Sequence, residues 1–79
     1  MTNRINVSVT VRFDPDGRMF PLSITWEDGR VFPVDRVLDV RRAASLKAGG
    51  QGIRYTCRIA GHERYLFFEN PGWFVEAAG

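Results

Sequence analysis

Four clusters of turn-forming residues divide this chain into short runs and constrain its fold more than any other feature. They are Asp14-Pro15-Asp16-Gly17, Glu27-Asp28-Gly29, Ala60-Gly61-His62-Glu63 and Asn70-Pro71-Gly72. Gly, Pro, Asn and Asp favour tight turns because each supplies or tolerates a backbone geometry that other residues avoid. The runs between the clusters alternate in polarity or are rich in β-branched and aromatic residues, which indicates strands. The sequence therefore predicts an all-β fold.

The first run, residues 5–13, alternates apolar and polar residues without a break, as a half-buried strand does. Its expected inner face is Ile5, Val7, Val9, Val11 and Phe13. A four-residue type I turn would pair Phe13 with Arg18 and bring the inward residues of the two strands together. A loop one residue shorter would set Thr10 against Leu22 and turn one strand over. We therefore predict the four-residue loop.

The second turn cluster predicts a different hairpin. A three-residue loop with Gly29 in the left-handed conformation would close a G1 bulge and pair Ile24 with Phe32 on the inner face. The strand that follows is unusually long, from residue 30 towards residue 41. We expect it to bend near Pro33 or Arg36, and to continue its inner face with two further residues. These are Leu38 and Val40.

The last two turn clusters predict two further strand connections. A two-residue Gly61-His62 turn would place Cys57 opposite Leu66 inside, with Arg58 beside Tyr65 and Arg54 beside Glu69 outside. Pro71-Gly72 suits a type II turn, which fits the twist of a hairpin poorly. We therefore expect the final strand to reach across to the first one.

One segment, residues 42–52, departs from this pattern because it is rich in Ala and Gly. One interpretation is a single helical turn ended by Gly49, with Leu46 closing an open end of the barrel. The other is an anion-binding loop, in which Gly-rich backbone lies near Arg41, Arg42 and Lys47. The segment lacks the Gly-Lys-Ser/Thr of a nucleotide-hydrolysing loop.

The length of the chain, 79 residues, allows one domain (residues 1–79) with one hydrophobic core. We expect a five- to six-stranded antiparallel meander curled into a small SH3-like or partly open barrel. Cys57 is the single cysteine, so neither an intramolecular disulfide nor a cysteine zinc site is expected. The chain begins without the apolar stretch of a signal peptide, and no apolar run is long enough to cross a bilayer. We expect a cytoplasmic protein with no membrane partner.

Few residues of this chain could carry out chemistry. His62 is the only histidine and falls at an expected turn tip, where a solvated role is favoured over acid–base catalysis. Cys57 is expected to face the core as an inert thiol. Asp35 and Asp39 share the outward side of a strand, but two carboxylates without a third oxygen ligand make a poor cation site. The sequence therefore predicts no enzyme activity, no cofactor and no metal.

One group of residues has the composition of a binding surface. Ten of the eleven basic residues are arginines, whose planar guanidinium binds phosphate and carboxylate through two hydrogen bonds. The candidate surface combines four residues on the outer face of the fourth and fifth runs with a neighbouring basic stretch. These residues are Arg54, Arg58, Tyr65 and Phe67, and then Arg41, Arg42 and Lys47.

Three functions remain open for this candidate surface and its surroundings. The favoured one is a non-catalytic module that docks to another protein or forms a homodimer through the outward Tyr65 and Phe67. The alternative is a weak nucleic-acid-binding module, in which the aromatic rings stack on bases and the arginines bind phosphates. The least favoured is a hydrolytic or anion-binding enzyme at the Gly-rich segment.

Several short motifs resemble those of a small bacterial domain family of unknown function. They are Trp26-Glu27-Asp28-Gly29-Arg30, the segment 34–41, Arg54-Tyr55, Tyr65-Leu66-Phe67 and Trp73-Phe74-Val75-Glu76. Members of that family carry a W-x-G-R-x-[YF]-x-V element, here with two residues between the Trp and the Gly, and a terminal W-[FY]-x-E. Some relatives accompany DNA-repair polymerase proteins, so the resemblance favours the nucleic-acid alternative. It implies no catalytic residue.

Overall fold

The computed structural model describes residues 3–42 and 52–77, and within them the chain forms six β-strands. The strands are β1 (Asn3–Phe13), β2 (Met19–Thr25), β3 (Val31–Arg42), β4 (Ile53–Ile59), β5 (His62–Glu69) and β6 (Gly72–Ala77). The expected helical turn, the proposed plug Leu46 and the basic Lys47 all lie outside the described residues. Within the described part, no helix is long and apolar enough to cross a membrane.

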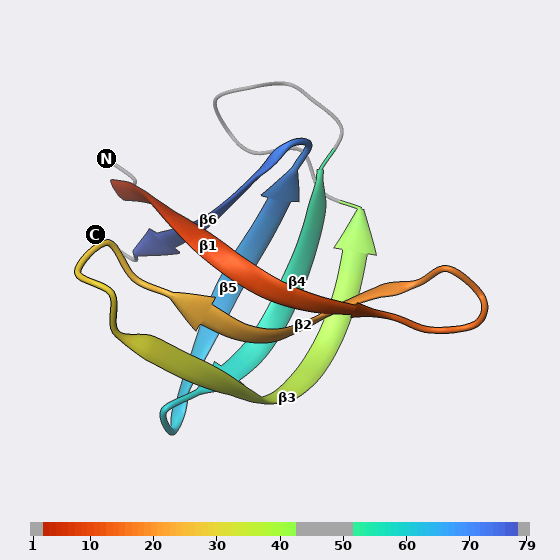
Figure 1. The fold of residues 1–79 in the computed structure, drawn as a ribbon, viewed down its shortest axis with the longest axis horizontal. Coiled ribbons are helices and arrows are strands. Elements are labelled where there is room, and N and C mark those ends of the chain that lie inside the picture. The colour runs from red at the N-terminus through yellow and green to blue at the C-terminus, as the bar shows by residue number, and fades with distance from the viewer. Residues whose placement is uncertain (1–2, 43–51, 78–79) are drawn as a thin grey trace.

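The six strands form an antiparallel meander that closes into a barrel when β6 returns to β1 (Figure 1). The two longest strands, β1 and β3, change partner along their length. Residues Asn3–Val7 of β1 pair with β6, whereas Ser8–Phe13 pair with β2. In the same way, β3 pairs first with β2 and then with β4. The predicted all-β meander and small barrel are confirmed, and the barrel is closed.

The predicted four-residue loop between β1 and β2 is wrong. The amide N–H of Asp14 donates to the carbonyl of Arg18, and Gly17, with φ +81°, closes a three-residue loop. In a regular ladder this shorter loop would put the inward residues of one strand opposite the outward residues of the other. A bulge prevents this. Val11 pairs with Pro21 and Thr10 pairs with Ser23, so Leu22 is the extra residue. Beyond the bulge the inner residues meet again. Phe13 was expected inside, but it is 65% exposed at the end of the barrel.

The predicted hairpin between β2 and β3 is confirmed. Gly29 has φ +89°, the Trp26 N–H donates to the carbonyl of Arg30, and Ile24 pairs with Phe32. The three-residue loop and its G1 bulge therefore form as the hydrophobic pattern requires.

The strand β3 bends where it leaves β2 for β4 (Figure 1), as expected near Arg36. Two register shifts lie in this stretch, between Val34 and Arg36 and between Val37 and Asp39. Because of them, Val37 rather than Leu38 packs on the core, and Leu38 is exposed. The predicted inner position of Leu38 is therefore wrong.

The connection between β4 and β5 also differs from the prediction. Ala60 and Gly61, both with positive φ, form the two-residue turn, so that Ile59 pairs with His62 and Cys57 with Arg64. The pairing differs from the predicted one by two residues, and the inner and outer faces are therefore unchanged.

The last connection differs from its prediction as well, because β5 and β6 are joined by Asn70-Pro71, with Glu69 opposite Gly72. The predicted type II turn on Pro71-Gly72 does not form. The expected contact of the last strand with the first does form, since β6 pairs with both β5 and β1.

The core lies inside the barrel and is built mainly from the second half of the chain. Its buried members are Ile24, Tyr55, Cys57, Ile59, Leu66 and Val75. The ring of Trp73 packs on it, 5.5 Å from Tyr55 and 4.8 Å from Phe68 between ring centres. Tyr55 also donates a hydrogen bond of 2.7 Å from its hydroxyl to the Met19 carbonyl, which joins β4 to the start of β2.

Candidate binding surface

The outer face of β4 and β5 carries the residues that the sequence placed there. Arg54 lies opposite Phe67, and Thr56 lies opposite Tyr65. The predicted neighbours are wrong by two positions: the Arg54 guanidinium carbon, not that of Arg58, lies over Tyr65, 4.7 Å from the ring centre. Arg58 instead lies opposite Glu63. Strand alternation thus places these side chains on the expected face even though the register differs.

The two aromatic residues of the candidate surface differ in exposure. Tyr65 is 47% exposed, whereas Phe67 is only 6% exposed. The Phe67 ring stacks on Phe74 of β6, with 5.0 Å between ring centres and 7° between ring planes. Only Tyr65 therefore presents a ring that a ligand could stack on.

A row of arginine and aromatic side chains continues across the outer face to β1. The guanidinium carbon of Arg4 lies 3.8 Å from the centre of the Phe74 ring, and its Nη2 lies 3.3 Å from Glu69 Oε1. Phe74 is completely buried between Arg4 and Phe67. In the described residues, Arg54 Nε and Glu69 Oε2 are buried without a hydrogen-bond partner. This row acts as a second, outer hydrophobic layer on β5 and β6.

The pairing of β3 with β4 places arginines directly opposite one another. Arg36 pairs with Arg58, and Arg41 pairs with Arg54. Side chains directly opposite in an antiparallel pair have Cβ atoms about 4.5–5.5 Å apart, and like charges there are destabilising. Two such pairs on one face therefore form a surface of concentrated positive charge, which we call the arginine surface. It consists of Arg36, Arg41, Arg54 and Arg58, together with the adjacent Tyr65.

The carboxylates near the arginine surface neutralise only part of this charge. Asp39 accepts from Arg41 Nε at 2.8 Å, and Glu63 lies opposite Arg58. No ion pair of Arg36 is present within the described part of the chain. The structure thus joins Arg41, Arg54, Arg58 and Tyr65 of the candidate surface. Arg42 is exposed but pairs with the inward Ile53, so it lies on the opposite side of β3 from Arg41 and its predicted place on this surface is wrong. Lys47 lies outside the described residues.

Arg36 is the residue of this surface that sequence reasoning missed. The sequence indicated this position only as a place where the strand bends, and its position opposite Arg58 depends on the two register shifts in β3. The pattern Asp35-Arg36 in a bent strand was the only signal for an outward arginine at this place.

The other candidate residues for chemistry are not brought together. Cys57 is completely buried, and burial raises the pKa of its thiol to about 11, so it is protonated at neutral pH. His62 is exposed at the start of β5. Within residues 3–42 and 52–77, no three His, Cys, Asp or Glu side chains are grouped to hold a metal ion.

Comparisons with known proteins leave the resemblance noted in the sequence as a prediction, because no protein-family model, no curated protein and no solved structure matches this chain.

Proposed function

We propose that this protein is a non-catalytic binding module that holds single-stranded nucleic acid on the arginine surface. The observation that carries the proposal is that two pairs of arginines lie at directly opposite positions on β3 and β4, Arg36 with Arg58 and Arg41 with Arg54. Such like-charged pairs destabilise the fold, and an anionic ligand bound between the guanidinium groups would relieve their repulsion. The sugar–phosphate backbone of a nucleic acid carries negative charges at regular intervals, and these can pair with a row of guanidinium groups.

Tyr65 is the proposed base-stacking residue. The residue is 47% exposed, Arg54 lies over its ring, and Phe67 lies 6.5 Å away between ring centres. A ring held in place loses little conformational freedom when a base stacks on it. Single strands are favoured over duplexes because only they offer free base faces.

Docking to another protein or forming a homodimer through Tyr65 and Phe67 has less support than the sequence suggested. The burial of Phe67 leaves Tyr65 as the exposed aromatic residue of that patch. A single ring surrounded by arginines is a small apolar contact for a protein interface. A cytoplasmic location belongs to the same proposal, because Cys57 is a free thiol and secreted domains of this size are often disulfide-bonded.

Salt dependence of binding tests the proposal. We expect the protein to bind fluorescein-labelled dT and rU oligonucleotides at low salt in an anisotropy assay, with affinity falling steeply as salt rises. Arg36→Gln and Arg58→Gln should each reduce the steepness of the log–log salt plot by about 0.7, the value for one phosphate contact in a single strand. Tyr65→Ala should weaken binding by about 1–3 kcal/mol and leave the salt slope unchanged.

Arg12→Gln is the matched control, because Arg12 is an exposed arginine on β1, which pairs with neither β3 nor β4. It should bind like the unmodified protein. Equal binding by all four variants would contradict the assignment of the surface. Absence of binding at low salt, together with salt-insensitive dimerisation in sedimentation experiments, would favour the self-association alternative instead.

A further inference from the structure

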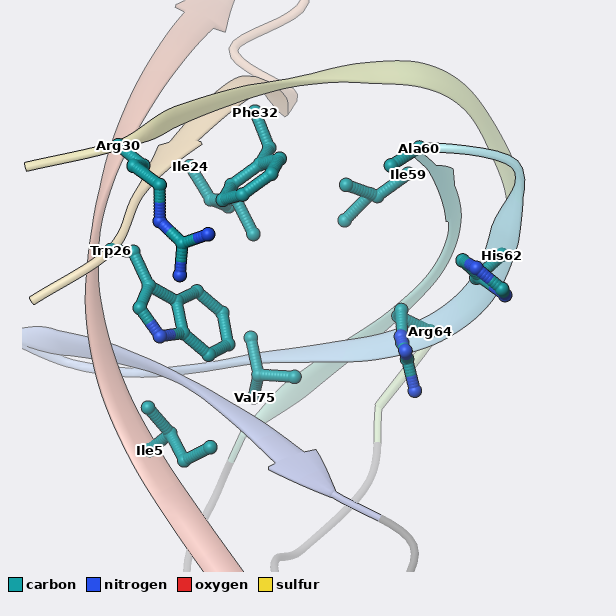
Figure 2. Close-up of a pocket in the computed structure, with 10 residues that line it drawn as sticks. All are labelled: Ile5, Ile24, Trp26, Arg30, Phe32, Ile59, Ala60, His62, Arg64 and Val75. Carbon is teal, nitrogen blue, oxygen red and sulfur yellow. The ribbon is translucent and has the colours of Figure 1, made fainter. Parts of the chain in front are cut away.

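One end of the barrel opens into a cavity of about 320 Å³ that is separate from the arginine surface. Figure 2 shows its lining, which comes from the end of β2 and the start of β3 on one side and from the β4–β5 turn on the other. Apolar side chains form most of it, chiefly Ile24, Trp26, Phe32, Ile59 and Val75. Ligand pockets of small molecules have this size and this predominantly apolar lining, and barrel ends are a common place for them.

The polar side chains at the opening are two arginines and a histidine. Arg30 lies on the same side as Trp26, and His62 and Arg64 lie on the opposite side (Figure 2). No carboxylate is among the described residues that line the cavity. The cavity therefore combines an apolar interior with an opening that favours negative charge.

The two arginines at the opening differ in how they are neutralised. Arg30 Nε lies 2.6 Å from Asp28 Oδ2, so its charge is paired, and its guanidinium carbon lies 5.6 Å from the centre of the Phe32 ring. Figure 2 shows its terminal nitrogens turned towards Trp26. Arg30 thus serves as part of the wall around the aromatic rings.

Arg64 has no ion pair within the described residues. It pairs with the inward Cys57 and lies two positions from the inward Leu66, so its stem starts on the inner side of β5. His62 precedes it by two positions on the same side of the strand and offers an imidazole nitrogen as a further donor or acceptor. An anion at this side of the opening would meet Arg64 and His62 together.

We propose that this cavity binds a small amphipathic carboxylate. Its aryl or alkyl body would lie against Trp26 and Phe32, and its carboxylate would accept hydrogen bonds from Arg64, with His62 as the neighbouring group. The volume holds one compact hydrophobic group. This site is independent of the nucleic-acid proposal, because no residue of the arginine surface lines it.

The test is a titration followed in ¹H–¹⁵N correlation spectra, with 3-phenylpropionate as the probe and 3-phenylpropan-1-ol as its uncharged counterpart. We expect saturable shifts of the Trp26 indole N–H and of the Arg64 and Ile59 amides at millimolar 3-phenylpropionate. The alcohol should bind about tenfold more weakly, because it cannot form a charge-assisted hydrogen bond. Arg64→Gln should weaken binding of the acid to the level of the alcohol.

Arg18→Gln is the matched control, because Arg18 is an exposed arginine that lines the cavity at the other end of the barrel. It should bind 3-phenylpropionate like the unmodified protein. Equal affinity for acid and alcohol, no saturable shift, or shifts centred on Met19 and Phe20 would each overturn the proposal. Tighter binding of a pentapeptide that ends in phenylalanine would also overturn it, because the ligand would then be the end of a protein chain.

Discussion

The barrel wall has two halves, β1–β3 and β4–β6, and only the second is buried on both its inner and its outer face. In β4, β5 and β6, residues adjacent in sequence are buried together, as in Tyr55-Thr56-Cys57, Leu66-Phe67 and Phe74-Val75. Neighbouring residues in each of these runs point alternately into and out of the barrel, so this wall is covered on both faces. In the described parts of β1, β2 and β3, only Pro21 and Ile24 are buried.

This difference separates stability from recognition. The outer layer of Phe67, Phe74 and Arg4 stabilises the β4–β6 wall but removes Phe67 from contact with ligands. The groups that remain available lie at the margins of that wall, where β3 joins β4 and at the open end near Arg64. A wall buried on both faces is a rigid support, and such support is what positions binding groups accurately.

The largest expected effect comes from removing the same side chain in each wall. Phe74→Ala deletes a completely buried ring of the β4–β6 wall and should lower the free energy of unfolding by about 3–5 kcal/mol. Phe13→Ala deletes a 65% exposed ring at the end of β1 and should change it by less than about 0.5 kcal/mol. Urea denaturation followed by circular dichroism measures both. Similar losses in the two variants would contradict the difference between the walls.

The alkaline limit of stability should be set inside the β4–β6 wall, by Cys57. Burial raises the pKa of its thiol from 9.0 to about 11, so the folded protein binds this proton more tightly than the unfolded chain. The bound proton therefore contributes roughly 2–3 kcal/mol to the free energy of unfolding. This contribution is complete below pH 9 and is lost as the pH rises to 11. Urea denaturation at pH 8.5 and pH 11 should reveal this loss.

Cys57→Ala is the control for the alkaline prediction. Its free energy of unfolding should fall less between the two pH values than that of the unmodified protein. Part of the loss should remain, because burial also raises the pKa of Tyr55. An identical pH dependence in the variant would assign the alkaline loss to groups other than Cys57.

Hairpin loops of the two walls should respond differently to the same glycine substitution. Gly29 of the β2–β3 loop has φ +89°, a conformation that costs an L-residue about 1–2 kcal/mol. No atom lies within 4 Å of an added Cβ there, so Gly29→Ala should lose that amount through strain alone. Gly72→Ala in the β5–β6 hairpin meets only the Glu69 carbonyl, at 4.0 Å, and should be nearly neutral. Thermal denaturation of both variants distinguishes these outcomes.

The sequence predicted the faces of the strands more accurately than their registers. Alternation identified the inward Cys57 and Leu66 because a half-buried strand has a period of two. The same period makes a shift of two residues invisible, so turns at Ala60-Gly61 and at Gly61-His62 fit the pattern equally well. A positive φ at Ala60 is unfavourable locally, and local preference therefore pointed to the other turn.

Bulges caused the remaining errors in the fold. A four-residue first loop follows only if the ladder is regular, but the extra residue Leu22 restores the inner face after a shorter loop. The register shifts in β3 likewise exchanged Leu38 for Val37 and placed Arg36 opposite Arg58. A bulge depends on packing across strands, and no local sequence rule states where it must occur.

The exposure of the candidate surface was predicted only in part. Outward alternation placed Tyr65 and Phe67 on one face, but exposure also depends on what lies above that face. Phe74 of β6 stacks on Phe67, and this contact joins residues from two strands whose register the sequence did not specify. The exposure of the arginines was easier to predict, because long charged side chains keep their ends in solvent.

The smallest expected change is a gain in stability rather than a loss. It concerns Arg36, which lies where β3 pairs with β4 and the two walls meet. Arg36→Glu replaces a like-charged cross-strand pair with an attractive one opposite Arg58, and should raise the free energy of unfolding by about 0.2–1 kcal/mol. The same variant should bind single-stranded oligonucleotides more weakly at low salt, because it removes one positive charge and adds a negative one. Arg12→Glu, on β1, has no arginine opposite it and pairs with Phe20, so it should bring no such gain in stability. A protein that becomes more stable as it loses affinity would mark Arg36 and Arg58 as residues placed for binding at the expense of the fold. Lower stability of Arg36→Glu would instead mean that the two guanidinium groups do not repel each other, and the main support for an anion-binding surface would be lost.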